Sequence, residues 1–319
     1  MAETPLNFYK SPLTADQAAR LKAILTEQGW KFTPKEYTLF YAQKNKLTIA
    51  VYEKGPKVVI QGKDTAEFVQ FTLEPEILGE AKLGYEELHN PEQFQPHFGI
   101  DESGKGDFFG PLVIAGVYVD PSIVRRFKEL GVQDSKNIKS DKKIRDLATA
   151  IRNTPGAASK VISIGPAKYN QLLEKTPNLN RLLAWGHATV IQGLVALRPD
   201  CPRALSDQFT KAPLIKRALG EKGNGILLEQ RTKAESDPAV AAASILAREA
   251  FINWMAENGR EFGKAFPRGA SAQVKQIATD LAAAHGPEVL RRIAKTHFKT
   301  ASEIAPETYP PKEKFTNLF

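Results

Sequence analysis

Two adjacent carboxylates stand directly before a glycine-rich turn in the stretch FGIDESGKGDFFGPL. Asp101 and Glu102 follow a short apolar run, and Gly104, Lys105 and Gly106 come next. Carboxylate oxygens bind hard divalent cations, and glycines let an anionic ligand approach the main chain closely. A cation site beside such a loop would suit phosphate chemistry.

Further acids lie at the ends of predicted strands. Asp207 follows the run RALS, and Glu235 and Asp237 lie between GILLEQ and a helix that begins at Pro238. Ligand sites in open α/β sheets gather at strand ends, so these acids could meet Asp101 at one sheet edge. Oxygen ligands alone favour Mg²⁺ or Mn²⁺ over zinc. Two such ions roughly 3.5–4 Å apart could activate a water and stabilise the leaving oxygen of a phosphodiester.

Each acid also has an ordinary structural interpretation. A strand-end aspartate often forms a turn, and Asp237 directly before Pro238 fits a helix N-cap. Adjacent strand residues point to opposite faces. We therefore expect Glu102 to join Asp101 only if the strand breaks there, which Gly104 would permit.

The composition narrows the class of protein. The chain has 319 residues, 42% of them hydrophobic, and a formal net charge of +8. This length predicts two domains, and the basic balance favours a nucleic-acid partner, although excess lysine can also serve solubility. The single cysteine, Cys201, fits a reducing compartment. With no apolar signal core and no membrane-length run, we expect a cytoplasmic protein that does not contact membranes.

A small α+β domain is predicted over residues 1–75. Thr14 and Gln17 form a capping-box pattern for a helix that ends at Gly29. Three alternating runs, EYTLFYAQ, LTIAVYE and KVVIQG, then predict antiparallel strands. A second helix is expected over 64–71. Residues 76–97 lose periodicity and are interpreted as a linker.

Residues 98–303 predict an α/β domain, a mixed sheet layered with helices. HFGI and LVIAGVYV are apolar on both faces, which indicates central strands, and SKVISI and RALS are expected to be short buried strands. GILLEQ predicts another strand. Helices are expected near 121–130, 141–152, 166–175, 178–197, from Pro238 onward, 271–284 and 286–296. Residues 304–319 are interpreted as a loose tail.

These residues resemble the type 2 ribonucleases H. The resemblance rests on GIDESGKGDFFGPLVIAGVYV, DSK at 134–136, SDQF at 206–209 and KAESDPAVAAASILARE at 233–249. The GKG loop followed by DFF, together with DQF and the later THF, looks like ribonuclease HIII and not ribonuclease HII. The amino-terminal domain is similar to the TATA-binding-protein-like domain of that family.

The resemblance implies an enzyme that cuts the RNA strand of RNA–DNA hybrids with Mg²⁺ or Mn²⁺ and leaves a 3′-hydroxyl. Asp101, Glu102 and Asp207 match three metal-binding acids of the family. For the fourth acid we favour Glu235, and Asp237 stays as the alternative.

The resemblance also assigns a substrate-binding role to several residues. Gly104, Lys105 and Gly106 match the loop that reads the ribose 2′-hydroxyl through its backbone, so cleavage should not depend on base sequence. Lys136 and Ser244 match positions near the nucleic-acid backbone, although Ser244 could equally be a helix-packing residue. In the amino-terminal domain, aromatic residues and lysines lie close together on the predicted strands and suit a nucleic-acid surface; they are Tyr37, Phe40, Tyr41, Tyr52, Lys44, Lys46, Lys54 and Lys57. For Phe40 we expect a core position.

Two other functions stay open: a ribonuclease HII-like cutter at single embedded ribonucleotides, and a non-catalytic nucleic-acid-binding protein. We expect a monomer. The last residues, KFTNLF, resemble the end of peptides that dock on a sliding clamp, through Phe315, Leu318 and Phe319. The same side chains could instead fold back onto the catalytic domain.

Overall fold

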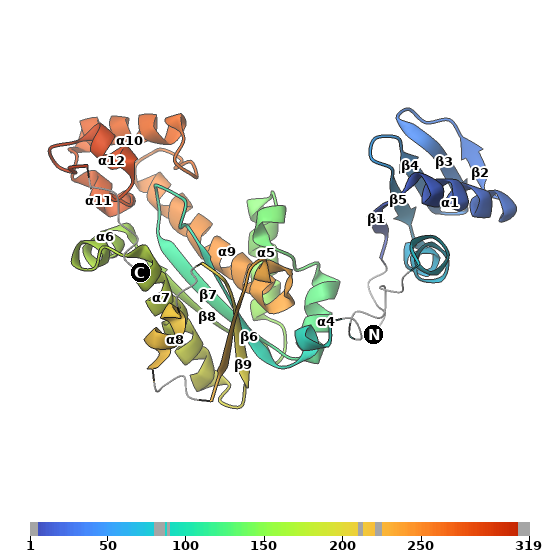
Figure 1. The fold of residues 1–319 in the computed structure, drawn as a ribbon. Helices are drawn as coiled ribbons and strands as arrows, with labels where there is room; N and C mark the ends of the chain where they lie inside the picture. Colours follow the sequence, from blue (N-terminus) through green and yellow to red (C-terminus); the bar gives the residue numbers. More distant parts are fainter. Residues whose placement is uncertain (1–5, 80–86, 88–89, 210–212, 221–224, 312–319) are drawn as a thin grey trace. The chain divides into compact units, whose positions relative to one another are not determined.

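The computed structural model describes residues 6–79, 87, 90–209, 213–220 and 225–311. The chain divides into two compact units, Met1–Glu92 and Gln93–Phe319. Figure 1 shows the elements of each unit.

The first unit contains an antiparallel sheet with the strand order β1-β5-β4-β3-β2. Its strands are β1 Phe8–Pro12, β2 Lys31–Thr33, β3 Thr38–Lys44, β4 Leu47–Tyr52 and β5 Lys57–Gly62. The three predicted strands are confirmed. The two edge strands, β1 and β2, were not predicted, because they are short and lack a clear apolar alternation.

Helix α1, Ala15–Glu27, covers one face of this sheet and begins with the predicted capping box of Thr14 and Gln17. The core includes Leu21, Leu25 and Ile60, all fully buried. Phe40 also lies in this core, as predicted.

The predicted helix over 64–71 differs from the structure. Helix α2 spans only Thr65–Phe68, and a π-helix, η1, continues as Val69–Leu78. This π-helix contains Pro75 and buries Leu73 and Ile77. Its apolar packing explains why helical structure extends past the position where the sequence loses periodicity.

The second unit is built on a mixed five-stranded sheet with the order β10-β9-β6-β7-β8. Its strands are β6 His97–Ser103, β7 Leu112–Val119, β8 Ala158–Ile164, β9 Arg203–Asp207 and β10 Leu227–Arg231. Strands β6, β9 and β10 are parallel, whereas β7 and β8 pair antiparallel. Strands β6 and β7 are central, as predicted. Strand β8 was expected to be buried, but it is an edge strand whose residues are mostly half-exposed.

The helices of this unit are α4 Pro121–Leu130, α5 Asp141–Arg152, α6 Pro166–Lys175, α7 Leu179–Leu197, α8 Leu214–Leu219, α9 Pro238–Glu261, α10 Ala272–His285, α11 Val289–Ile293 and α12 Lys299–Ile304. The helix expected near 286–296 is therefore shorter, and α12 was not predicted. Within the described ranges, none of these helices is long and apolar enough to cross a membrane.

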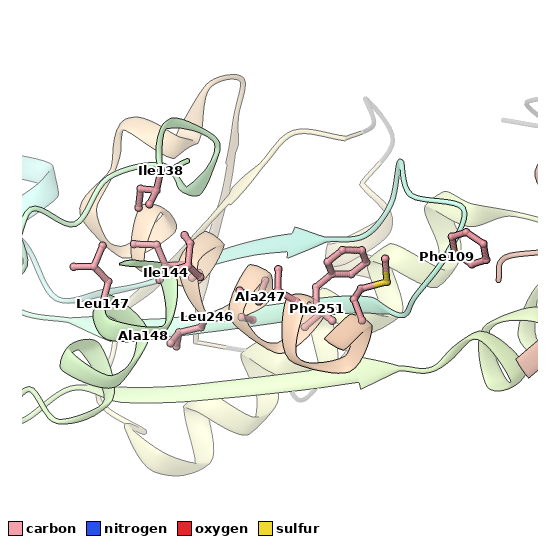
Figure 2. Close-up of a cluster of buried hydrophobic side chains, with 14 of the residues drawn as sticks. Phe109, Ile138, Ile144, Leu147, Ala148, Leu246, Ala247 and Phe251 are labelled. Atoms are coloured by element: carbon pink, nitrogen blue, oxygen red, sulfur yellow. The ribbon is translucent and has the colours of Figure 1, made fainter. Parts of the chain in front are cut away.

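Helices α9 and α7 pack on opposite faces of the sheet (Figure 1). Val113 and Ala115 of β7 belong to the cluster on the α9 side, whereas Leu112 and Ile114 belong to the cluster on the α7 side. Figure 2 shows part of the α9 side, where Leu246 packs close to α5. This mixed sheet layered with helices is the α/β arrangement predicted for residues 98–303, and it is preceded by a small α+β unit.

Candidate active site

Strand β6 carries both acids of the first pair and continues without a break through Ser103. Asp101 pairs with Ala115 and Glu102 with Ile114 of β7, so the two side chains point to the α9 and α7 faces respectively. The strand does not break between the two acids but ends at Ser103, directly before Gly104, so the condition for both side chains to share one face is not met. The two carboxylates share the end of one strand while they belong to opposite faces of the sheet.

Asp207 lies beside Asp101 through the register of the parallel strands. Phe98 pairs with Ala204 and Ile100 with Ser206. One step further along each strand, Asp101 and Asp207 stand at the same level and face the same side. The sheet therefore brings together two of the predicted acids that are far apart in sequence.

Lys136 places its ammonium group among these acids. Burial lowers the pKa of Lys136, but Asp134, Asp101, Glu235 and Asp207 outweigh burial and raise it above the ordinary value. Carboxylates from four segments thus act on one positive charge. The same group of oxygens would suit a hard cation.

Asp101 is the most perturbed member of this group. Burial, with a smaller contribution from the neighbouring charge of Glu102, raises the pKa of Asp101 well above its ordinary value. A hydrogen bond donated by the Glu102 amide, at 2.8 Å, acts in the opposite direction. A carboxylate in this position gains from a positive partner, which a metal ion or Lys136 can provide.

Glu102 is held by a histidine that the sequence analysis missed. His187 on α7 is fully buried, and its Nε2 lies 3.1 Å from Oε2 of Glu102. Its Nδ1 lies 3.0 Å from the hydroxyl of Ser206. Burial alone would raise the pKa of Glu102, but the hydrogen bond and charge of His187, together with Lys105 and Lys136, lower it. A lone histidine in an apolar helix gives no sequence signal of this contact.

The two candidates for the fourth acid are in different surroundings. Glu235 lies in a short 3-10 turn, η5 Ala234–Ser236, where it is partly exposed and near Lys136. Asp237 is buried; its Oδ1 accepts from the amides of Ala239 and Val240 and lies 2.9 Å from Nε2 of His97. Asp237 thus caps α9, and the partners of its Oδ1 all lie inside the protein.

The glycine loop has two glycines with different constraints. Gly104 has a φ of +89°, and a Cβ there would stand 2.1 Å from the carbonyl oxygen of Pro111. A Cβ on Gly106 would have no protein atom within 4 Å. The fold itself therefore requires glycine at 104, whereas at 106 the backbone faces open space. Nζ of Lys105, the residue between the two glycines, lies 3.9 Å from Oε1 of Glu102.

Ser244 supports Lys136 indirectly. It is buried on α9, donates to the carbonyl of Ala241 and accepts from the amide of Ser135 at 3.0 Å. Both contacts are internal, so Ser244 anchors the turn η3, Ser135–Asn137, that presents Lys136.

The donor set consists of oxygens, as Mg²⁺ and Mn²⁺ prefer. Within the described ranges, no three His, Cys, Asp or Glu side chains are already close enough to form a metal cluster. Asp101 and Asp207 nevertheless share one face beside Lys136. The residues therefore fit a site that divalent ions would complete.

A second candidate surface lies on the first unit. Phe8, Lys10, Tyr52 and Lys57 line a hollow of about 540 Å³, together with Tyr37, Glu53, Lys54, Val59 and Gln61. Lys57, Val59 and Gln61 of this lining alternate with the buried Val58 and Ile60 along β5, so they belong to the face of the sheet opposite the core. Tyr41 was also predicted for this surface, and Nζ of Lys35 lies over its ring, 4.6 Å from the centroid.

Comparison with known proteins shows the family of the chain. Residues 98–301 match the family model described as Ribonuclease HII. Ribonuclease HIII of Protochlamydia amoebophila (strain UWE25) is 44% identical over 287 residues, which cover 90% of this chain and 93% of that protein. The crystal structure of Bst-RNase HIII in complex with Mn²⁺ is similar with a TM-score of 0.64 and 27% identity, covering 93% of this chain and 97% of that one.

A second similar structure is ribonuclease HII in the PCNA:RNase HII complex from Archaeoglobus fulgidus. It matches with a TM-score of 0.51 and 30% identity, and it covers 60% of this chain and 91% of that chain. The relatives named ribonuclease HIII match over both units, whereas this one matches a shorter part. The chain therefore belongs to the ribonuclease HIII family of type 2 ribonucleases H and is a ribonuclease of RNA–DNA hybrids.

Proposed function

We propose that the chain hydrolyses the RNA strand of RNA–DNA hybrids with two divalent ions and four acids, Asp101, Glu102, Asp207 and Glu235. The main support is the position of Asp101 and Asp207, at one level on parallel strands and beside Lys136. When bound, two Mg²⁺ or Mn²⁺ ions supply positive charge at the scissile phosphate and activate water. The Mn²⁺ complex of Bst-RNase HIII supports a divalent ion in this role.

The protein's own groups would divide the remaining work. Asp101 and Asp207 would hold the ions. Glu102 belongs to the other face but lies close enough to raise the pKa of Asp101, so it would join them at the end of β6 while His187 fixes its carboxylate. Glu235, which is partly exposed, would complete the site, whereas Asp237 would cap α9. Lys136, which lies near these acids, would bind a phosphate oxygen of the substrate.

Ribose recognition would come from the main chain of Gly104, Lys105 and Gly106. The 2′-hydroxyl both donates and accepts a hydrogen bond, and it distinguishes RNA from DNA without reading a base. Open space at Gly106 supports close approach of a ribose. Gly106→Ala is therefore expected to weaken hybrid binding without unfolding the protein, whereas Gly104→Ala should damage the loop itself.

One cleavage assay distinguishes this function from its alternatives. It uses a duplex with a long RNA stretch and a duplex with one embedded ribonucleotide, each with Mg²⁺, with Mn²⁺ and with chelator. We expect metal-dependent cleavage at many positions of the RNA stretch. Cleavage confined to the single ribonucleotide would favour a ribonuclease HII-like activity, and binding without cleavage would favour a non-catalytic protein.

The first unit would provide additional affinity as a substrate-binding domain that resembles the TATA-binding protein. The proposed division keeps residues 1–75 as this domain, 76–97 as a linker, 98–303 as the catalytic domain and 304–319 as the tail. The lysines and aromatic rings around the hollow would contact phosphates and bases or sugars.

The proposed clamp contact through Phe315, Leu318 and Phe319 lies outside the described residues. The solved complex of PCNA with ribonuclease HII from Archaeoglobus fulgidus supports a test of this contact. We expect the full chain to bind the clamp of its own organism weakly and as a monomer. Light scattering of the mixture, with Leu318 and Phe319 changed to Ala as control, tests both points.

A further inference from the structure

Lys295, between α11 and α12, is a lysine with no exposed surface. Its Nζ donates to three main-chain carbonyls, of Asp107 at 2.9 Å, Phe109 at 3.4 Å and Gly110 at 2.6 Å. All three acceptors belong to the segment that follows the Gly104–Gly106 turn. One side chain thus holds one loop from its protein side.

The main chain strengthens the same attachment. The amide of Lys295 donates to the carbonyl of Phe108 at 2.8 Å, and the amide of Gly110 donates to the carbonyl of Ile293 at 2.9 Å. Phe109 is fully buried, and its ring stacks on Phe266 with a centroid distance of 4.8 Å. Figure 2 shows Phe109 at the end of the buried cluster that contains Phe251. Residues 107–110 therefore form the anchored half of the loop.

The other half, 104–106, begins at the buried Gly104 and reaches the surface at Gly106. Its turn is closed by one main-chain bond, from the Asp107 amide to the Gly104 carbonyl at 3.3 Å. Gly106 is exposed and has open space beside it. Because Asp107 ends this turn and also contacts Lys295, the position of this half depends on the anchored half.

Burying the charged side chain of a lysine is unfavourable. Burial lowers the pKa of Lys295 to about 7, and Asp107 opposes that shift. Among the described residues, no carboxylate forms an ion pair with its ammonium group. Several oxygens nevertheless need donors at this point, and the N–H bonds of one amine, three while it is charged, can serve these carbonyls, which an apolar side chain cannot.

We propose that Lys295 is a positioning residue for ribose recognition: by holding the carbonyls of Asp107, Phe109 and Gly110, it sets where the backbone of Gly104–Gly106 meets the 2′-hydroxyl. This inference rests on the proposed function of that loop. Lys295 contacts the loop and not the acids on β6 and β9. Its loss should therefore change the preference for RNA over DNA in binding.

The test compares Lys295→Met with the wild type, both in an Asp101→Asn background that prevents cleavage. Met has a similar length and no donor. Lys295→Gln keeps an N–H donor on a shorter chain and gives a milder change if the Met variant folds poorly. Lys275→Met is the matched control, since it removes an exposed lysine of α10 that pairs with Glu303. Dissociation constants are measured for an RNA–DNA hybrid and for a DNA–DNA duplex of the same sequence, below the melting transition of each variant.

We expect Lys295→Met to bind the hybrid about tenfold more weakly, the equivalent of about one hydrogen bond, with DNA-duplex affinity unchanged. Lys295→Gln should show a smaller change, and Lys275→Met should match the wild type. A lower melting temperature with unchanged preference for the hybrid would overturn the proposal and leave Lys295 as a stabilising contact. If the wild type itself binds both duplexes equally, or if Gly106→Ala binds the hybrid normally, the ribose-reading function fails and this inference fails with it.

Discussion

Nε2 of His187 lies 3.1 Å from Oε2 of Glu102, with no exposed surface on the histidine. The ring also contacts the hydroxyl of Ser206 through Nδ1 at 3.0 Å. Ser206 stands one residue before Asp207. Its hydroxyl can donate one hydrogen bond, either to Nδ1 of the ring or to the carbonyl of Asp207. When the Ser206 hydroxyl donates to Nδ1, the neutral ring carries its hydrogen on Nε2, and that N–H donates a hydrogen bond to Glu102. The contact joins both acid-bearing strands to α7.

His187→Leu should therefore release Glu102 and weaken metal binding. Groups that orient a metal ligand typically change affinity or activity by about 10–100-fold. We expect a decrease in that range for Mn²⁺ affinity, and a smaller decrease for His187→Gln, whose amide can still donate to Glu102. Mn²⁺ binding is measured by electron paramagnetic resonance without substrate. Equal Mn²⁺ affinity in the wild type and both variants would contradict the assignment.

Glu235 and Asp237 should separate catalysis from folding. Glu235→Gln removes a charge from the acids around Lys136, so cleavage should fall by about 100-fold or more with an unchanged melting temperature. Asp237→Ala removes the cap of α9 and the contact with His97, so stability should fall by at least about 1 kcal/mol. Single-turnover rates and thermal unfolding of Glu235→Gln, Asp237→Ala and Asp237→Asn give the answer. A larger rate decrease for Asp237→Asn than for Glu235→Gln would reverse the assignment.

The hollow on the first unit should contribute binding and not chemistry. Changing Lys10, Lys54 and Lys57 to Gln should raise KM with a similar kcat, because these lysines would bind the ground state and the transition state equally well. The slope of log K against log salt should become shallower by about 0.9 for each phosphate that the variant no longer neutralises. Lys22→Gln, on the helix that covers the opposite face, serves as control. An unchanged slope would show that this surface does not meet the nucleic-acid backbone.

Lys295 also predicts a pH dependence of stability. Its pKa is about 7 in the folded protein, below the ordinary 10.5. Between these values the unfolded chain holds a proton that the folded chain has released, so folding becomes more favourable as pH rises through this window. The gain approaches about 1.4 kcal/mol per pH unit and is absent below the folded pKa.

The free energy of unfolding of the wild type minus that of Lys295→Met isolates this contribution, since other groups cancel. Urea titrations between about pH 6 and about pH 9 should show the difference moving in favour of the wild type as pH rises. A pH-independent difference would mean that Lys295 keeps its charge when folded.

The acids could be named as candidate metal ligands from the sequence because they follow the ends of predicted strands and carry the oxygen atoms that hard cations prefer. Asp101 and Asp207 each followed an apolar run, and the parallel pairing of β6 and β9 confirms that these strand ends are neighbours. Most helices were predicted because their apolar periods and caps are strong, as in α1 with Thr14 and in α4 with Asp120.

The contacts that join distant segments left no such pattern. In the sequence, His187 is a single polar residue in an apolar helix, and Lys295 is a charged residue directly before THF. Both side chains are nevertheless fully buried. Asp101 and Glu102 were expected to need a strand break, because alternation separates their side chains. The unbroken strand instead supplies one acid to each face.

The central claim is that Asp101 and Asp207 act together on the scissile phosphate. Asp101→Asn keeps the shape of the side chain and removes the charge, and Asp207→Asn does the same on the next strand. The decisive measurement is the single-turnover cleavage rate of an RNA–DNA hybrid at saturating Mg²⁺, with hybrid affinity measured on the same samples. We predict that both variants fall to less than about 1% of the wild-type rate while hybrid affinity is retained. A rate for Asp101→Asn close to that of the wild type would contradict the account.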